Sequence, residues 1–504
     1  MVFSSSIFVF FFLPLVLLAY GSLAVLLRIG RFPSDLSFRI LNGLLLIASL
    51  VFYAWGEPIL VLVMIGATWV NYILGRFLGS VQDGAGNPAD RKRRKWILGL
   101  AVGLNLLLLG IFKYFNFGVD NLNALLEILG LEALKVPWAI TLPLGISFYT
   151  FQLMSYVIDV YRGDAPPCRS FVSFASYITM FPQLVAGPIV RYADIVPYLF
   201  KRSVSLDGFA YGVRRFVYGL GKKLLIANVV AVPADSIFGL SPEQLTAPLA
   251  WLGAFLYYLQ IYFDFSGYSD MAIGMGHMFG FKFMENFNYP FRAWSLREFW
   301  RRWHISLSTW IRDYLYIPLG GNRVSPVRQL FNLFIVFVLC GLWHGPSWSY
   351  VTWGLLHGGL MVAEKMGWER FTERWVHPAI RILSTQLYVC ICFLLFRTES
   401  FLQTRDMVMA MFGNGASVDI SVPVSFFLTR DVLAAMTFGL LLGFPILPFI
   451  WKKVAELWRG HPLLSSVLVT WGYWGEVLCL SAVFLACSLQ MASGTHNPFI
   501  YFRF

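Results

Sequence analysis

The chain has 504 residues, of which 58% are hydrophobic and only 13% are charged, and its mean hydropathy is +0.66. Soluble domains carry about 25% charged residues, so this composition excludes an ordinary soluble enzyme and indicates a protein that is surrounded by lipid. The formal net charge of +12 does not indicate nucleic-acid binding, because the basic residues fall in short loops between apolar runs, as in membrane proteins.

Apolar runs long enough to cross a bilayer follow one another along the whole chain. A transmembrane helix needs about 20 mostly apolar residues, so we predict an all-α polytopic membrane protein with about 11–12 spans. No composition shift marks a soluble domain, and we expect one integral-membrane domain over residues 1–504. The predicted spans are 6–27, 39–55, 58–79, 96–115, 139–160, 207–236, 249–280, 329–345, 348–366, 380–396, 432–451 and 467–490.

The charges between these runs predict their orientation. Arg28 and Arg31 follow the first run, and Arg91-Lys-Arg-Arg-Lys95 follows the third, whereas the turn after the second run holds only Glu57. By the positive-inside rule the N-terminus is predicted to be periplasmic in a bacterial inner membrane, with the basic loops in the cytoplasm. The first run is too long for a cleavable signal peptide and is predicted to be a retained span.

Two apolar stretches do not have the pattern of continuous spans. Residues 171–200 are interrupted by Pro182 and Gly187-Pro188, and residues 286–326 are aromatic, basic and bounded by Pro290 and Pro318. Irregular backbone at membrane depth is tolerated only where it is buried in protein or lines water. We predict that both segments are re-entrant or lie at the interface as amphipathic helices.

His344 stands at the end of an apolar run, directly before Gly345-Pro346. An imidazole there can accept a proton from a hydroxyl group and pass it on, which makes His344 a candidate general base. The residues alone leave a second interpretation equally open, in which His344 is a core histidine bonded to a backbone carbonyl.

His304 lies in a polar stretch from Glu298 to Asp313. His304, Ser308 and Arg312 are spaced four apart and would share one face of a helix. Because arginine side chains suit phosphates, this stretch could receive an anionic donor. The alternative is a basic amphipathic segment that touches lipid headgroups.

Two carboxylates, Asp264 and Asp270, lie in the predicted span 249–280. Carboxylates in an apolar helix need partners, and we expect arginines of the 286–326 segment to provide them in structural ion pairs. No metal-ligand spacing and no Ser-His-Asp order is readable, so we predict no metal site.

Many blocks in this order resemble the membrane-bound O-acyltransferase (MBOAT) family, and within it the bacterial branch of alginate O-acetylation membrane proteins. The resemblance covers nearly the full chain. Its blocks are Ser49–Trp55, Leu142–Gln152, Ile158–Arg162, Ala186–Pro188, Tyr262–Asp270, Met284–Asn288, Glu298–His304, Tyr314–Asn322, Gly341–Gly345 and Pro498–Phe504.

The resemblance implies a helical core around a tunnel that crosses the membrane. It implies an O-acetyltransferase with no permanently bound cofactor, which uses acetyl-CoA as donor substrate. The acetyl group would pass toward an exopolysaccharide such as alginate with the help of extracytoplasmic acetyltransferase partner proteins. The family's hallmark histidine matches His344, as catalytic base or relay, and its second histidine matches His304.

We therefore expect His344 and His304 to be catalytic. The residues expected to bind the donor or line the tunnel are Arg301, Arg302, Trp303, Ser308, Arg312, Asp313, Asp264, Asn286 and Trp343. A transporter would also show broken helices and polar groups at the midplane, and a non-catalytic scaffold of a polysaccharide export complex remains a further alternative. Within the enzyme class, a carrier-protein thioester is the alternative donor.

Overall fold

The computed structural model describes residues 1–80, 88–137, 139–415, 422–457 and 462–494, and this part of the chain is helical without strands. The closing Pro498–Phe504 block lies outside the described residues. Eight described helices are long and apolar enough to cross a membrane, which confirms the prediction of an all-α polytopic protein. These helices are Phe8–Ile29 (η1 and α1), Ser34–Ala54 (α2), Val61–Ser80 (α3), Ala89–Ile128 (within α4, Pro88–Ile128), Leu206–Phe238 (α9, η2 and α10), Pro326–His344 (α14), Pro378–Arg397 (α17) and Thr470–Ala492 (within α21, Pro462–Ala492).

The other predicted spans are also helical, but they differ from simple spans. α5 (Ile146–Arg162) and α15 (Trp348–Ala363) have 17 and 16 residues, and α11 (Ala247–Met278) has 32 but contains many polar side chains. The predicted span 432–451 is two helices, α19 (Arg430–Gly443) and α20 (Ile446–Leu457), bent by 60°. Pro445 lies at the bend, and the residue before a proline is disfavoured in helical conformation.

Short helices form where the sequence predicts broken segments. Residues 171–200 contain α6 (Phe171–Thr179), α7 (Phe181–Leu184) and α8 (Tyr192–Phe200). Residues 286–326 contain η3 (Pro290–Arg292), α12 (Leu296–Trp300), α13 (Ile305–Ile311) and η4 (Arg312–Tyr316). The remaining described helices are η5 (Glu364–Trp368), α16 (Glu369–Trp375), α18 (Phe401–Met411) and η7 (Val424–Phe426).

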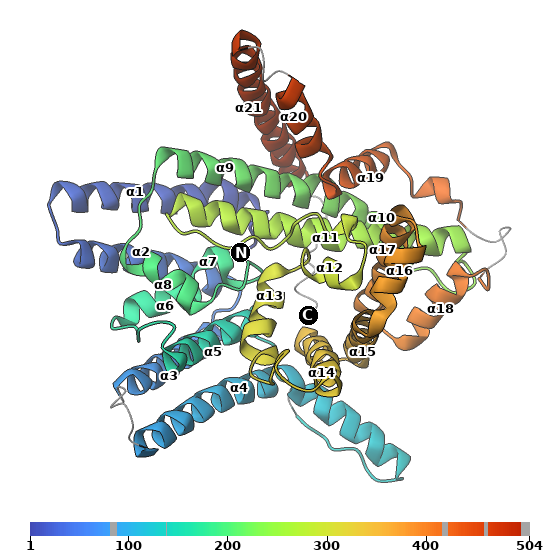
Figure 1. Ribbon diagram of the computed structural model, residues 1–504, viewed down its shortest axis with the longest axis horizontal. Coiled ribbons are helices and arrows are strands. Elements are labelled where there is room, and N and C mark those ends of the chain that lie inside the picture. The colour runs from blue at the N-terminus through green and yellow to red at the C-terminus, as the bar shows by residue number, and fades with distance from the viewer. Residues whose placement is uncertain (81–87, 138, 416–421, 458–461, 495–504) are drawn as a thin grey trace.

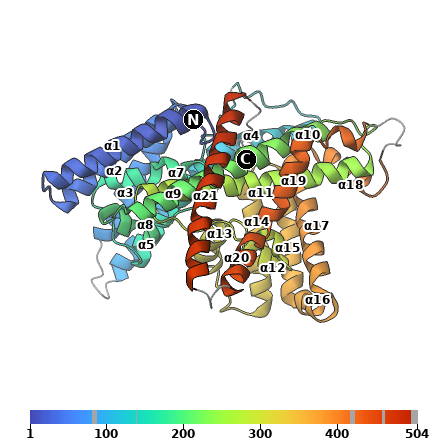
Figure 2. The same ribbon diagram turned by 90° about the horizontal axis from the view of Figure 1, so that it is seen from above.

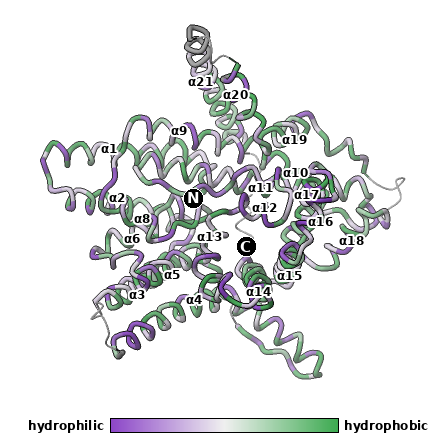
Figure 3. The backbone as a smooth tube through the Cα atoms, viewed as in Figure 1, coloured by the Kyte–Doolittle hydropathy of each residue, from purple (hydrophilic) through white to green (hydrophobic). Residues whose placement is uncertain are grey.

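The long helices surround these short ones. Figure 1 shows α12 and α13 in the middle of the molecule, with α9 and α11 along one side and α14, α15 and α17 along another. The view from above in Figure 2 also places α14, α15 and α17 side by side. α20 and α21 project from the body next to α9. Figure 3 shows apolar residues along most of the long helices and hydrophilic residues at the start of α4 and around α16.

Glycine pairs hold α9 and α11 in close contact. A Cβ on Gly212 would lie 2.6 Å from the carbonyl oxygen of Gly274, and a Cβ on Gly219 would lie 2.5 Å from that of Gly267. Small residues let helix backbones approach within a membrane, where packing must replace the hydrophobic driving force. Residue numbers rise from 212 to 219 along α9 while those of the contacting glycines fall from 274 to 267 along α11, so the two helices are antiparallel.

This crossing supplies the partners of the two buried carboxylates, and the predicted pairing with arginines of the 286–326 segment is wrong. Asp264 Oδ1 lies 2.7 Å from Lys223 Nζ, and both side chains are 2% exposed. Asp270 pairs with Arg215 at 2.7 Å and with Lys222 at 2.6 Å. All three cations come from α9 and η2, because the glycine contacts place that helix directly against α11.

The Lys223–Asp264 pair gives a stability prediction. Removing one partner of a buried ion pair typically costs about 3–5 kcal/mol, because the remaining charge is desolvated. Asp264→Asn is therefore expected to lower the unfolding temperature of the detergent-solubilised protein strongly, and the double variant Lys223→Met/Asp264→Leu is expected to recover most of the loss. A single variant as stable as wild type would contradict the structural role of this pair.

Candidate functional site

The candidate site lies at the C-terminal end of α14, where His344 is the last helical residue. Gly345 is extended (φ −175°) and Pro346 follows, so the helix cannot continue. Close packing fixes this end against α15: a Cβ on Gly341 would lie 2.3 Å from the Tyr350 carbonyl oxygen. His344 is 8% exposed, and its side chain is thus held inside the protein rather than against lipid.

Aromatic rings surround the imidazole of His344. The ring centroids of Trp343, Trp353 and Phe396 lie 5.0, 5.2 and 5.0 Å from it. Trp343 also approaches the second candidate, because its ring centroid lies 6.4 Å from that of His304. The structure therefore brings both predicted histidines to the two sides of one indole.

His304 is held in a strained backbone conformation. It lies in the left-handed region (φ 45°, ψ 52°) directly before α13, and its side chain is buried. Its Nδ1 lies 3.1 Å from the Oδ1 of Asn286, which also accepts hydrogen bonds from the backbone and hydroxyl of Ser306. Because an amide oxygen only accepts, His304 Nδ1 carries the proton and Nε2 carries a lone pair.

Several ring nitrogens near His344 have no hydrogen-bond partner among the described residues. Trp353, which packs against His344, also packs against a third imidazole: its ring centroid lies 4.3 Å from that of His357. Buried polar atoms are normally satisfied, so unpartnered nitrogens gathered in one place are a candidate binding site. We call the following residues the indole–imidazole cluster, each with an unpartnered ring nitrogen: Trp300 Nε1, His304 Nε2, Trp343 Nε1, Trp353 Nε1 and His357 Nε2.

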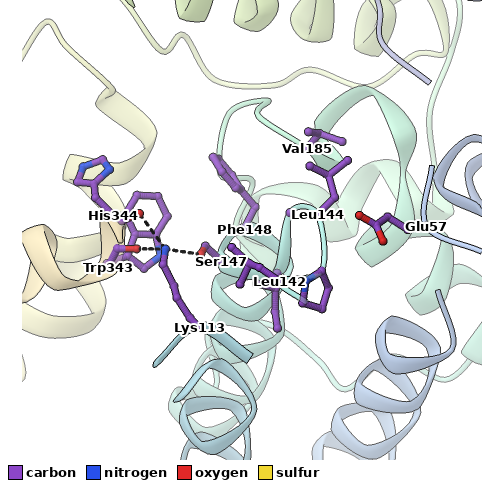
Figure 4. Close-up of a pocket in the computed structure, with 12 residues that line it drawn as sticks. Glu57, Lys113, Leu142, Leu144, Ser147, Phe148, Val185, Trp343 and His344 are labelled. Carbon is purple, nitrogen blue, oxygen red and sulfur yellow. Dashed lines mark hydrogen bonds between the residues drawn. The ribbon is translucent and has the colours of Figure 1, made fainter. Parts of the chain in front are cut away.

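A cavity of about 170 Å³ reaches the backbone of His344 from the side of α4 and α5. Its lining includes Glu57, Lys113, Ser147, Trp343 and His344. Figure 4 shows the Lys113 ammonium between the Ser147 hydroxyl and the carbonyl oxygens of Trp343 and His344, with Glu57 at the far side of the cavity. Burial raises the pKa of the Glu57 carboxyl above its ordinary value.

The cavity and the predicted donor-binding stretch lie at opposite ends of α5. Ser147, at the start of α5, lines the cavity, whereas Arg162, at its end, donates to the Asp313 carbonyl oxygen (3.0 Å). Arg94, in the basic first turns of α4, also donates to the Tyr161 carbonyl oxygen (2.8 Å) at that end. At 1.5 Å per residue the two ends are about 23 Å apart, which is most of a bilayer core of about 30 Å.

The predicted arginines lie on the Asp313 side, and the structure gives each a carboxylate neighbour. Arg302 is mostly buried and donates to Glu298 (2.7 Å), whereas Arg301 is 70% exposed and lies 3.7 Å from the same carboxylate. Arg312 is 61% exposed and pairs with Asp313, which also pairs with Arg191 at 2.6 Å. Arg301 and Arg312 are thus the more accessible cations of the three.

The other predicted residues have different surroundings. Asn286 orients His304, and Trp343 contacts both histidines, so these two belong to the site. Trp303 packs against Phe287, Phe299 and Phe393. Ser308 is half-buried, and its hydroxyl has no hydrogen-bond partner among the described residues. Asp264 belongs to the ion pair with Lys223 described above.

Sequence reasoning missed Lys113, Tyr114, Ser147 and Glu57 as members of the site. Lys113 did carry a signal, because it is the only charged residue of the apolar run 96–115. An ionisable residue inside a span is a functional candidate by default. The other three carry no such signal, and only the folded arrangement of α3, α4 and α5 shows them. His357 bonds through Nδ1 to the Trp353 carbonyl (3.1 Å), as expected for a structural hydrogen-bonder.

Sequence comparisons with known proteins place this chain among the acyltransferases. Residues 168–402 match the family model described as "MBOAT, membrane-bound O-acyltransferase family". The chain is 40% identical over 516 residues to the "Probable alginate O-acetylase AlgI" of Pseudomonas putida, with 100% of both chains covered. It is 32% identical over 550 residues to the "Peptidoglycan O-acetyltransferase" of Helicobacter pylori, covering 100% of this chain and 98% of that one. It is 28% identical over 279 residues to the "Teichoic acid D-alanyltransferase" of Bacillus subtilis, covering 51% and 69%.

The backbone of His304 gives a prediction in which glycine is preferred over alanine. A left-handed residue with a Cβ costs roughly 1–2 kcal/mol, and glycine avoids this cost. His304→Gly is therefore expected to be more stable than His304→Ala by about 1 kcal/mol. Thermal unfolding of both detergent-solubilised variants measures the difference.

Thr309, inside the helix α13, provides the matched control pair. There the order is expected to reverse, with Thr309→Ala more stable than Thr309→Gly, because glycine is unfavourable inside a helix. An alanine variant at 304 that equals or exceeds the glycine variant in stability would contradict the strained backbone.

Proposed function

Because the chain belongs to the membrane-bound O-acyltransferase family, we propose that it transfers acetyl groups from cytoplasmic acetyl-CoA toward a polysaccharide outside the cytoplasmic membrane. The chain is a multi-pass membrane protein and an O-acyltransferase. The names of the full-length relatives, an alginate O-acetylase and a peptidoglycan O-acetyltransferase, support acetyl as the group and a glycan as the acceptor. We favour an exopolysaccharide such as alginate, because the alginate-named relative is 40% identical and the peptidoglycan-named one 32%.

The indole–imidazole cluster around His344 is the observation that carries this proposal. Its nitrogens provide indole N–H donors and imidazole lone pairs within a buried aromatic site. A thioester carbonyl can accept from such donors, and an acceptor hydroxyl can donate to an imidazole. Hydrogen-bond donors held in a site that excludes water stabilise the charge that develops on a carbonyl oxygen under attack.

In the proposed reaction His344 is the general base. Its imidazole takes the proton of the acceptor hydroxyl while the hydroxyl oxygen attacks the thioester carbonyl carbon. The carbon–sulfur bond then breaks, the proton passes to the leaving thiolate, and an ester and a free thiol result. His304, on the other side of Trp343, lies where it can orient or polarise the thioester.

The two ends of α5 support opposite entries for the two substrates. The basic start of α4 at Arg91–Lys95 is assigned to the cytoplasm by the positive-inside rule, and its Arg94 bonds to the α5 end that also contacts Asp313. We therefore propose that the phosphates of acetyl-CoA bind on that side, where Arg301 and Arg312 are exposed. The cavity with Glu57 and Lys113 then faces the periplasm, together with the N-terminus, and receives the acceptor or an extracytoplasmic acetyltransferase partner.

A thioester assay separates this proposal from its two rivals. Full-length protein in proteoliposomes is incubated with acetyl-CoA labelled in the acetyl group, with and without alginate oligosaccharide. An acyltransferase releases free CoA and moves the label, whereas a transporter or a scaffold leaves the thioester intact. A carrier-protein donor would appear as activity with an acetylated carrier and none with acetyl-CoA.

His344 gives the matching functional prediction in cells. A strain that lacks the chromosomal copy is complemented with variants, and the O-acetyl content of its exopolysaccharide is measured by proton NMR. Loss of a general base typically lowers the rate by about 10²–10⁴-fold, so His344→Ala is expected to abolish acetylation with normal insertion.

His277 is the matched control. His277 belongs to α11, where its side chain is half-buried against the ring of Tyr211 from α9 and is not part of the indole–imidazole cluster. His277→Ala is therefore expected to retain acetylation. Acetylation in the His344→Ala strain at the wild-type level would remove His344 from the mechanism.

A further inference from the structure

Two adjacent residues of α4 bind the last three carbonyl oxygens of α14. Tyr114 donates its hydroxyl hydrogen to the Leu342 carbonyl, and Lys113 donates to the carbonyls of Trp343 and, at 2.9 Å, of His344. The last carbonyls of a helix have no partners within the helix and must be bonded from elsewhere when they are buried. A neighbouring helix thus fixes the backbone that carries the catalytic imidazole.

Every N–H group of the Lys113 ammonium has a hydrogen-bond acceptor in this arrangement. It has three N–H donors, and they meet three oxygens: the Trp343 and His344 carbonyls and the Ser147 hydroxyl (3.1 Å). The side chain is 4% exposed, and the described residues contribute no carboxylate to it. The negative end of the α14 dipole and the Trp343 ring, 5.8 Å away, are what offset its charge.

A neutral cap would bind the same carbonyls with less desolvation. Glycine or asparagine commonly end helices, and a buried ammonium costs several kcal/mol even after relaxation. A cation at this position is therefore an expensive way to end a helix. The expense is explained if one side chain must hold three oxygens, and with them the His344 backbone, in a fixed place.

Two further imidazoles are among the titratable groups near His344. His304 faces it from the segment before α13, and His357 faces it from α15. α17 contributes the Phe396 ring, which does not titrate. Among these neighbours, Lys113 is the group that bonds directly to the backbone of His344, at its carbonyl oxygen (2.9 Å).

Accepting the proposed role of His344 as general base, we propose that Lys113 is a positioning residue for this base, because it fixes the end of α14 from which the imidazole projects. Ser147 supports this role, because its hydroxyl oxygen accepts the third N–H of the ammonium and so fixes the Lys113 side chain. Lys113 lies at the cavity end of α5 and not at the arginine side, so its effect concerns the chemical step rather than binding of acetyl-CoA.

Four variants test this position in the proteoliposome thioester assay. Lys113→Gln keeps two N–H donors on a shorter side chain, whereas Lys113→Arg keeps the charge and several donors. Tyr114→Phe removes one cap of α14 and leaves the charge unchanged. Ser147→Ala keeps the charge and removes one acceptor. For each variant kcat, KM for acetyl-CoA and the unfolding temperature are measured.

Lys113→Gln is expected to lower kcat by about 100-fold with little change in KM, as a misplaced group can do. A glutamine side chain at this position has only two N–H donors on a shorter chain and cannot hold all three oxygens. Tyr114→Phe is expected to lower the unfolding temperature with a smaller loss of kcat, because it releases only the Leu342 carbonyl. Lys113→Arg, which keeps several N–H donors, is expected to recover part of the kcat that Lys113→Gln loses.

Wild-type kcat in Lys113→Gln would overturn the inference. If that variant does not insert, Ser147→Ala decides: a lower kcat at unchanged KM supports the inference, and a wild-type kcat overturns it. Failure of the proposed function is distinguishable, because wild-type protein would then leave the thioester intact.

Discussion

The whole arrangement depends on one constraint: polar groups buried at membrane depth must find partners inside the protein, because lipid offers none. The end of α14 is the place where this constraint matters most. Its last carbonyls are bound by Lys113 and Tyr114 of α4, and its imidazole is enclosed by aromatic rings. The nitrogens that remain unpartnered in the described residues are concentrated there, at Trp343, His304 and their neighbours. All the buried, unpartnered ring nitrogens among the described residues belong to this one cluster, where chemistry is expected.

The same constraint explains how the scaffold supports the site. α9 and α11 approach closely at glycine pairs, and the ion pairs that need this contact lock them together. α11 in turn carries Ser269, which binds the Asn286 amide, and Asn286 holds His304. The strain of the His304 backbone is thus opposed by a chain of hydrogen bonds that begins at the most buried helix of the fold. α5 connects the two sides, with Ser147 at the cavity and Arg162 at the arginine-rich end.

Local sequence patterns predicted the elements, and long-range packing decided the rest. The first three spans and the end of α14 agree with prediction, because apolar length and the Gly345-Pro346 pair are local signals. The partners of Asp264 were predicted wrongly, because the choice of cation depends on which helix crosses α11. The bend between α19 and α20 was not predicted, because the continuous apolar run 432–451 indicated one span, although Pro445 marks the bend in the sequence. The histidines and Trp343 were all named from sequence, whereas the position of Trp343 between the two imidazoles and the cap from α4 emerge only from the fold.

The central claim is that the acyl carbonyl reaches the indole–imidazole cluster from the arginine side. A cryo-electron microscopy structure of the full-length protein with a thioether analogue of acetyl-CoA, in which a methylene keeps the acetyl carbonyl from being cleaved, tests this claim most directly. The account predicts that the carbonyl oxygen lies within hydrogen-bond distance of one of the cluster nitrogens, with the phosphates near Arg301 or Arg312. An analogue bound with its carbonyl in the Glu57 cavity, or against the lipid face of the helices, would contradict it.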